Sequence, residues 1–226
     1  FADAVTYLGA APHDKARPGI DVARAGTQKA LALPPGVGLY GVSHRFLESA
    51  RAVGSRGFFL DLVRITEAHL AASPPMTPTL PLLNALLEQL TAIERGEWEV
   101  RLAGGAHGVP AGGSPGGDGW SMRFARHAVM RSMAAEWIDE IGSLCEGVER
   151  PGGAGFVASS PSVTCVSVGG RDVGDVLARM RERGFEIAPG YGALKETHVR
   201  LGHMGDHSVA EFGSLLRALS GILLGS

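Results

Sequence analysis

The stretch that most constrains the fold is residues 19–38, which runs from an apolar segment through one lysine into a Pro-Pro-Gly sequence. Its letters are GIDVARAGTQKALALPPGVG. The apolar residues after Asp21 predict a strand, and the small polar residues that follow predict a turn. The two prolines then end the regular structure, because proline cannot donate a backbone hydrogen bond. We therefore predict a strand and a turn that presents Lys29.

Lys29 stands out because the chain uses arginine for nearly all its positive charges. The sequence holds 21 Lys and Arg residues, and only Lys15, Lys29 and Lys195 are lysines. Arginine keeps its proton at ordinary pH, whereas a desolvated lysine can lose its proton and attack a carbonyl carbon. Lys29 is therefore a candidate nucleophile, and on chemistry alone a surface lysine on a loop is an equally good interpretation.

The composition is that of an ordinary soluble globular protein and argues against several classes. The chain has 226 residues, of which 45% are hydrophobic and 19% charged, and its formal net charge of −2 gives no reason to expect nucleic acid or an anionic membrane as partner. No apolar run reaches the roughly 18 residues that span a bilayer, and no signal peptide is visible. Cys145 and Cys165 lack the spacing of a metal site. We predict a cytoplasmic protein without a metal.

The lysine stretch resembles a known family. The letters DVARAGTQKALALPPG, residues 21–36, are similar to the cofactor-lysine segment of class V aminotransferases, which are pyridoxal-phosphate enzymes of fold type I. Alanine–glyoxylate and serine–pyruvate aminotransferases are the members that it resembles. The resemblance implies that Lys29 binds the cofactor as a Schiff base. It also implies that Lys29 is the catalytic acid and base that moves the proton from the substrate Cα.

A second resemblance lies at the start of the chain. Residues 1–9, FADAVTYLG, are similar to a family segment whose aspartate pairs with the pyridine nitrogen of the cofactor, and Asp3 stands 26 residues before Lys29, as in that family. A carboxylate beside this nitrogen keeps the ring protonated, which makes it a better electron sink. The resemblance therefore implies that Asp3 binds the cofactor. An aspartate that caps a turn is the alternative interpretation.

The resemblance assigns three further cofactor contacts. Thr27 and Gln28 are expected to contact the phosphate or the ring hydroxyl. Thr77 matches a threonine that helps to hold the phosphate of the other subunit's cofactor across a dimer interface. A helix N-cap is its alternative role, and both roles can hold at once. Many relatives place a tyrosine three residues before this threonine. Pro74 stands there in this chain, so one phosphate contact is lost or supplied elsewhere.

The substrate residue comes from the C-terminal part. The letters GYGALK at 190–195 and VRLGHMG at 199–205 resemble a family motif whose arginine binds the α-carboxylate of the substrate, and Arg200 matches that arginine. A guanidinium offers two parallel donors to a carboxylate and so fixes its position and angle. An arginine in an ordinary ion pair is the alternative. His203 and Met204 are expected to be packing residues.

The fold class expected from the resemblance is α/β. Residues 1–149 are predicted to form the later part of the large cofactor-binding domain, with a flexible glycine-rich insertion at 103–119. Residues 150–226 are predicted to form a small α+β domain. Periodicity and turn signals predict strands at 37–43, 162–168, 185–188 and 198–202 and helices at 44–53, 80–93, 120–142, 173–183 and 208–224.

One helix face carries several positive charges. In the helix predicted at 120–142, the residues Arg123, Arg126, His127 and Arg131 line one side. We expect this side to be a solvated surface, because arginine is rarely buried without a partner. Apolar residues on the other side, among them Trp137, are expected to be buried.

These features predict an aminotransferase that moves an amino group from alanine or serine to a 2-oxo acid such as glyoxylate or pyruvate. The absence of a second obvious substrate-binding arginine favours a small amino donor. The alternatives are another class V enzyme, such as a phosphoserine aminotransferase or a lyase, and a non-catalytic subunit that keeps the fold as a scaffold.

The resemblance covers only the C-terminal part of such an enzyme. The family's N-terminal part supplies a glycine-containing phosphate loop, a residue that stacks on the ring and the first strands of the sheet. The chain opens within a strand at Phe1. We therefore expect a second polypeptide, either a subunit or a cleavage product, to carry that part, and the complete unit to be a dimer.

Overall fold

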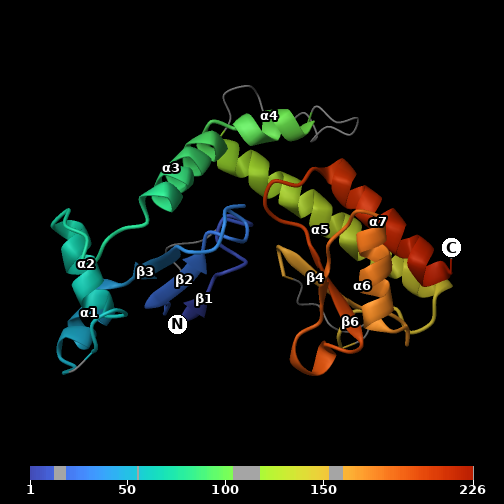
Figure 1. The fold of residues 1–226 in the computed structure, drawn as a ribbon, viewed down its shortest axis with the longest axis horizontal. Coiled ribbons are helices and arrows are strands. Elements are labelled where there is room, and N and C mark those ends of the chain that lie inside the picture. Colours follow the sequence, from blue (N-terminus) through green and yellow to red (C-terminus); the bar gives the residue numbers. More distant parts are fainter. Residues whose placement is uncertain (13–18, 55, 104–117, 153–159, 226) are drawn as a thin grey trace. The chain divides into compact units, whose positions relative to one another are not determined.

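The computed structural model describes residues 1–12, 19–54, 56–103, 118–152 and 160–225 (Figure 1). The contacts within the chain define two compact units. Unit 1 comprises Phe1–Leu8 and His13–Thr91, and unit 2 comprises Gly9–Pro12 and Ala92–Ser226. The predicted domain boundary after residue 149 stays a prediction.

Unit 1 is built on a three-stranded sheet. Its strands are β1 (Ala2–Asp3), β2 (Val22–Gly26) and β3 (Gly38–Val42), in the order β1-β2-β3. Strand β1 runs parallel to β2, and β3 runs antiparallel to it. The predicted strand before Lys29 is therefore confirmed, and it is the central strand of this sheet.

The helices of unit 1 follow from local capping signals. Helix α1 (His44–Arg51) begins after Ser43, whose hydroxyl accepts a hydrogen bond from the Phe46 amide at 3.0 Å, so this predicted N-cap is confirmed. Helix α2 (Leu62–Leu70) is capped in the same way by Asp61. Helix α3 (Leu80–Glu94) matches the leucine-rich helix that the sequence predicts.

Unit 2 places a second three-stranded sheet against helices. Strands β4 (Val163–Ser167) and β5 (Ala188–Pro189) both pair antiparallel with the central strand β6 (His198–Gly202). The helices of unit 2 are α4 (Glu97–Ala103), α5 (Gly119–Leu144), α6 (Val173–Glu182) and α7 (Val209–Leu224). Helices α5, α6 and α7 lie beside this sheet in Figure 1.

Alternation along β6 separates a buried face from an open one. Val199 and Leu201 are fully buried in a core that also holds Val166 of β4 and side chains of the three helices. Arg200, which stands between them, points to the other face of the sheet because side chains alternate along a strand. This pattern is the reason that Arg200 stands outside the core.

The expectation of a solvated basic face on α5 is wrong. Arg123, Arg126 and His127 are each at most 1% exposed, and only Arg131 of the four lies at the surface. The charges are buried because carboxylates are buried with them. Arg126 pairs with Glu99 of α4 at 2.6 Å, and Arg123 pairs with the carboxylate of Asp206 at 2.7 Å.

The predicted insertion at 103–119 lies almost wholly outside the described residues. Helix α4 ends at Ala103, and α5 begins at Gly119. A Cβ atom on Gly119 would lie 1.9 Å from the carbonyl oxygen of Ile93, so the start of α5 requires a glycine at this close approach. Among the described residues no helix is long and apolar enough to cross a lipid bilayer.

Candidate functional site

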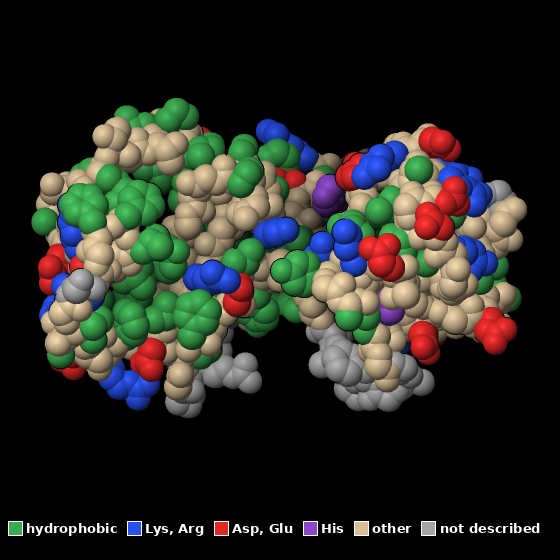
Figure 2. All heavy atoms as spheres, turned by 60° about the horizontal axis from the view of Figure 1, so that its bottom comes forward, with side chains coloured by type: hydrophobic (Ala, Val, Ile, Leu, Met, Phe, Trp, Pro, Cys, Tyr) green, Lys and Arg blue, Asp and Glu red, His purple; other side chains and the backbone are tan. Residues whose placement is uncertain are grey.

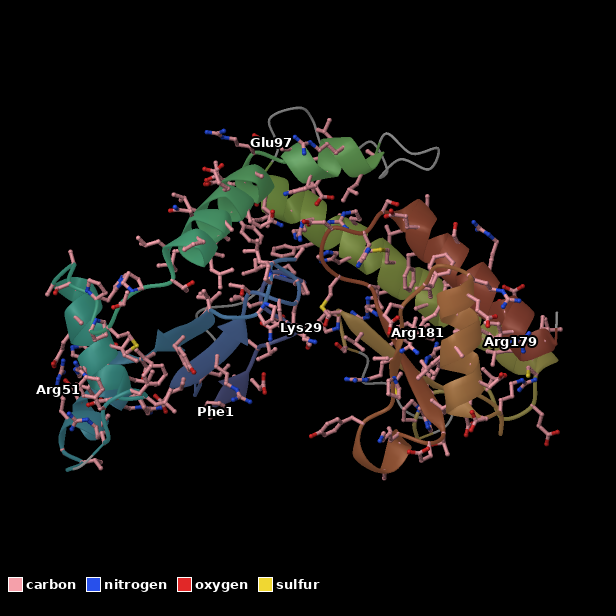
Figure 3. All side chains as sticks on the ribbon, viewed as in Figure 1. Phe1, Lys29, Arg51, Glu97, Arg179 and Arg181 are labelled. Atoms are coloured by element: carbon pink, nitrogen blue, oxygen red, sulfur yellow. The ribbon has the colours of Figure 1, made fainter. Side chains whose placement is uncertain are left out.

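Lys29 lies on a tight turn directly after β2. The turn is held by backbone hydrogen bonds from Ala32 to the Lys29 carbonyl, at 2.8 Å, and from Leu33 to the Thr27 carbonyl, at 3.1 Å. Ala30 and Leu31 are buried and anchor the turn to unit 1. Figure 3 labels the Lys29 side chain beside the small sheet. The packed turn presents a half-buried lysine.

The amine of Lys29 has no ionic partner in the part of the chain that the structure describes. The charged amine of a lysine on an exposed loop is hydrated and needs no partner. A half-buried amine without a partner loses part of its hydration, which disfavours its charged form. The arrangement therefore suits an amine that reacts with a carbonyl group.

Thr27 and Gln28 flank the lysine differently. Thr27 is buried, and its hydroxyl donates its one proton to the carbonyl oxygen of Pro34 at 2.9 Å. The structure thus gives Thr27 a role in closing the turn, and its predicted cofactor contact stays a prediction. Gln28 is exposed, and its side-chain amide folds over Gly26, where a Cβ atom would lie 2.4 Å from Oε1.

Asp3 ends β1 and lies directly opposite Arg24 of β2. Its Oδ2 accepts a hydrogen bond from Arg24 Nη2 at 2.8 Å, and its Oδ1 accepts one from the Val5 amide at 3.0 Å. These two donors, Arg24 first, lower the pKa of Asp3. Since parallel strands end at the same edge of a sheet, Asp3 and the turn of Lys29 share one edge.

Thr77 is exposed in the segment before α3. The helix begins at Leu80, and the carbonyl of Thr79 accepts the first helical hydrogen bond, from Leu83 at 3.0 Å. The N-cap position therefore belongs to Thr79, and the alternative role of Thr77 as a cap is wrong. Its predicted contact with a cofactor phosphate stays a prediction.

Arg200 is held at the centre of the second sheet. Its Nε donates to the Pro189 carbonyl oxygen at 2.8 Å, and its neighbours directly across β4 and β5 are Cys165 and Ala188. Within the described residues no carboxylate pairs with its two terminal NH2 groups. One end of the guanidinium is thus fixed to the backbone, and the other end is left as a two-pronged donor for a carboxylate.

His203 follows β6 and is buried beside Phe212, whose ring centroid lies 5.8 Å away in an edge-on arrangement. Its Nε2 lies 2.9 Å from the hydroxyl oxygen of Thr164. Burial lowers its pKa to about 4, so the ring is neutral near pH 7. The prediction that His203 is a packing residue is confirmed.

The predicted site residues are divided between the two units. Asp3, Thr27, Gln28 and Lys29 lie at one edge of the unit 1 sheet, Thr77 lies in unit 1 before α3, and Arg200 belongs to unit 2. The sequence reasoning missed Arg24. The signal was available in principle, because a positive residue in a strand next to one that ends in an aspartate predicts a cross-strand ion pair.

The residues present fit pyridoxal phosphate. An unpaired amine can bind its aldehyde carbon, an ionised carboxylate can face its ring nitrogen, and a guanidinium with open donors can hold the carboxylate of an amino acid. In the described part of the chain no three side chains of His, Cys, Asp or Glu cluster to hold a metal ion.

Comparison with known proteins finds relatives that are named as hydrogenase subunits and relatives that are named as aminotransferases. The chain is 26% identical over 226 residues to a soluble hydrogenase 42 kDa subunit of Anabaena cylindrica, which covers 99% of this chain and 51% of that protein. It is 27% identical over 226 residues to an L-aspartate–glyoxylate aminotransferase of Paracoccus denitrificans, which covers 98% of this chain and 48% of that protein. The chain thus spans about half the length of these relatives. No protein-family model matches the sequence.

The solved structures agree on the fold. An aspartate aminotransferase of subgroup IV from Thermus thermophilus matches 98% of this chain and 54% of its own, with 26% identity and a TM-score of 0.73. An alanine–glyoxylate aminotransferase from Nostoc sp. matches 98% of this chain and 52% of its own, with 23% identity and a TM-score of 0.76. The chain is therefore related to the class V aminotransferases and has the fold of the C-terminal part of these fold type I enzymes.

Proposed function

We propose that this chain supplies the C-terminal part of a pyridoxal-phosphate-dependent aminotransferase. The observation that carries the proposal is the edge of the unit 1 sheet, where the parallel strands β1 and β2 bring Asp3 and the turn of Lys29 to the same edge, and no described residue pairs with Lys29. A scaffold protein has no use for a half-buried lysine that no described residue pairs with, at the sheet edge where an ionised carboxylate also lies.

The proposal assigns a role to four of the predicted site residues. Lys29 holds the cofactor and, when released by the substrate, carries the proton away from the substrate Cα. Asp3 faces the ring nitrogen, and Gln28 lies beside the lysine as a polar contact. Arg200 binds the substrate α-carboxylate and sets the angle of the Cα–H bond. When bound, pyridoxal phosphate supplies the electron sink that makes this proton acidic.

The surroundings of Arg200 favour a small substrate. The side chains directly across from it on both neighbouring strands are short, those of Cys165 and Ala188. Neither offers a positive charge for a second carboxylate. We therefore propose alanine or serine as the amino donor and glyoxylate or pyruvate as the acceptor.

We propose that sequence outside this chain supplies the rest of the fold. Unit 1 exposes large apolar side chains, among them Phe58, Phe59 and Leu60, which are 65–72% exposed. Figure 2 shows hydrophobic side chains gathered on part of the surface. Burial of such a surface is favourable, which supports a complementary part of the enzyme covering it. We propose that this part also brings the phosphate loop, and that the complete unit is a dimer in the cytoplasm.

The first experiment locates the cofactor on the complete protein that contains this chain. The purified protein is incubated with pyridoxal phosphate, reduced with borohydride, digested and mapped by mass spectrometry. We expect the pyridoxyl mass on Lys29 and none on Lys195, which lies exposed in unit 2. Lys29→Ala should abolish the visible absorption band, and Lys195→Ala should keep it. Labelling of Lys195 alone, or no labelling, would overturn the proposal.

The relatives named as hydrogenase subunits favour a second candidate, a non-catalytic subunit of a larger assembly. The two candidates differ in turnover. After the cofactor is located, the protein is given alanine or serine with glyoxylate, and the new amino acid is measured. Glycine formation that is lost in Lys29→Ala supports the aminotransferase. A protein that binds no cofactor and forms no glycine supports the subunit.

A further inference from the structure

The cofactor aspartate has a cationic neighbour. Arg24 lies directly opposite Asp3 in the β1–β2 register, and its Nη2 donates to Asp3 Oδ2 at 2.8 Å. The other oxygen, Oδ1, accepts the Val5 amide at 3.0 Å. Each oxygen of the carboxylate therefore has a donor from the chain itself.

The pair is isolated on its sheet. Across β2 on the other side, Arg24 faces Tyr40 of β3, and the guanidinium carbon lies 5.6 Å from the centroid of the Phe1 ring. Among the described residues no second carboxylate pairs with Arg24. Asp3, Arg24 and Tyr40 are thus the titratable groups that face one another here. The charge of Arg24 acts on Asp3 and on whatever Asp3 binds.

The effect on a ring nitrogen has a definite sign. A pyridinium proton is stabilised by the full negative charge of an aspartate, and Arg24 draws on that charge through its hydrogen bond. The guanidinium also repels a second positive charge placed at the same carboxylate. Both effects disfavour the protonated ring, so they add and do not cancel.

We propose that Arg24 is a positioning residue that fixes the Asp3 carboxylate and holds the ring nitrogen of the bound cofactor less protonated than Asp3 alone would. This inference rests on the proposed function, because it requires pyridoxal phosphate on Lys29 with its ring nitrogen at Asp3. The inference goes beyond the proposed function, because it assigns to the bound cofactor a weaker electron sink than Asp3 alone would give. One cross-strand ion pair sets this difference.

The test reads the protonation state of the ring directly. The complete protein is loaded with pyridoxal phosphate that carries nitrogen-15 in the ring, and the chemical shift of that nitrogen is followed by NMR as a function of pH. Arg24→Gln removes the charge and keeps a hydrogen-bond donor. We expect it to raise the pKa of the ring nitrogen by about one unit, the lower end of what a neighbouring charge does. Arg24→Lys keeps the charge, and we expect it to change the pKa of the ring nitrogen less than Arg24→Gln does.

A matched control uses another exposed ion pair of the same unit. Arg45 pairs with Asp21 at 2.7 Å, so Arg45→Gln breaks an Arg–Asp pair of the same kind away from Asp3. We expect its ring titration to equal that of the unchanged protein. An identical titration in Arg24→Gln, or an equal change in Arg45→Gln, would overturn the inference.

The failure of this inference is distinct from the failure of the proposed function. If borohydride leaves no pyridoxyl group on Lys29, the proposed function fails first. If Lys29 is labelled and the ring nitrogen has the same pKa in the unchanged protein and in Arg24→Gln, only the role of Arg24 fails. Circular dichroism and the melting temperature of each variant show that the fold is intact.

Discussion

Arg126 of α5 donates two hydrogen bonds to the carboxylate of Glu99 of α4, at 2.6 and 2.9 Å. Both side chains are buried and only 1% exposed. The same guanidinium donates to the carbonyl oxygen of Gly205 at 2.9 Å. Gly205 lies shortly after β6, the strand that carries Arg200. The buried pair therefore joins α4 and α5 to the segment after β6.

Removing the charge of Glu99 should destabilise unit 2. Glu99→Gln leaves the guanidinium groups of Arg126 and Arg123 buried without their shared carboxylate. Breaking a buried pair in this way costs about 3–5 kcal/mol. We expect a loss of that size in the free energy of unfolding, measured by urea denaturation. Glu186→Gln, which breaks an exposed pair with Arg181, serves as the control and should change little.

Acid should destabilise the protein through two buried histidines. Burial lowers the pKa of His127 and of His203 to about 4, from an ordinary value of 6.5. The unfolded chain therefore binds protons between pH 6.5 and 4 that the folded chain does not. Stability is full above about pH 6.5 and falls as the pH drops towards 4, by up to about 1.4 kcal/mol per pH unit for each histidine.

The measurement is the free energy of unfolding at several pH values in that window. His203→Gln keeps a polar side chain that does not titrate there, so we expect a shallower slope than in the unchanged protein. His44→Gln alters an exposed histidine and is the control. Equal slopes in all three proteins would contradict the prediction.

Arg200 should control substrate affinity without affecting the cofactor. Arg200→Gln removes the two terminal donors that the Pro189 carbonyl leaves open. The loss of a charged hydrogen-bonding partner costs about 2–3 kcal/mol, which corresponds to a roughly 30–150-fold higher KM for both amino and 2-oxo acids. Steady-state kinetics give these KM values, and the visible spectrum shows whether the cofactor is kept.

Arg200→Lys separates charge from geometry, because lysine keeps the charge and lacks the planar fork. We expect the KM values of Arg200→Lys to lie between those of the unchanged protein and those of Arg200→Gln. Arg217→Gln on the exposed side of α7 is the control. If Arg200→Gln loses the cofactor and keeps its KM values, the assignment of Arg200 to the substrate is wrong.

A carboxylate placed across from Arg200 should compete with the substrate. Cys165 lies directly opposite Arg200 on β4, and directly opposite side chains of antiparallel strands are close enough to pair. Cys165→Glu should therefore raise the KM for the amino acid by about tenfold or more, since an ion pair of about 1.4 kcal/mol is enough for that factor. Cys165→Ser, which adds no charge, should leave the KM nearly unchanged. Equal KM values in both variants would place the substrate elsewhere.

Local signals in the sequence were sufficient for the elements that hold the site. The strand before Lys29, the turn that presents it and the Ser43 cap of α1 each depend on residues a few positions apart. Such short-range chemistry can be read without knowing the tertiary contacts. The family resemblance likewise predicted the fold, because its motifs are ordered along the chain.

The tertiary structure alone decided which charges meet. The partners of Arg126 on α5 include Glu99, 27 residues earlier, and the carbonyl of Gly205, 79 residues later, so a face that looks solvated in the sequence is buried. Arg24 and Asp3 meet only through the register of two strands. The sequence by itself determined the local elements and the residue types of the site. The long-range pairing determined the electrostatics, because charge interactions depend on distance in space and not on separation along the chain.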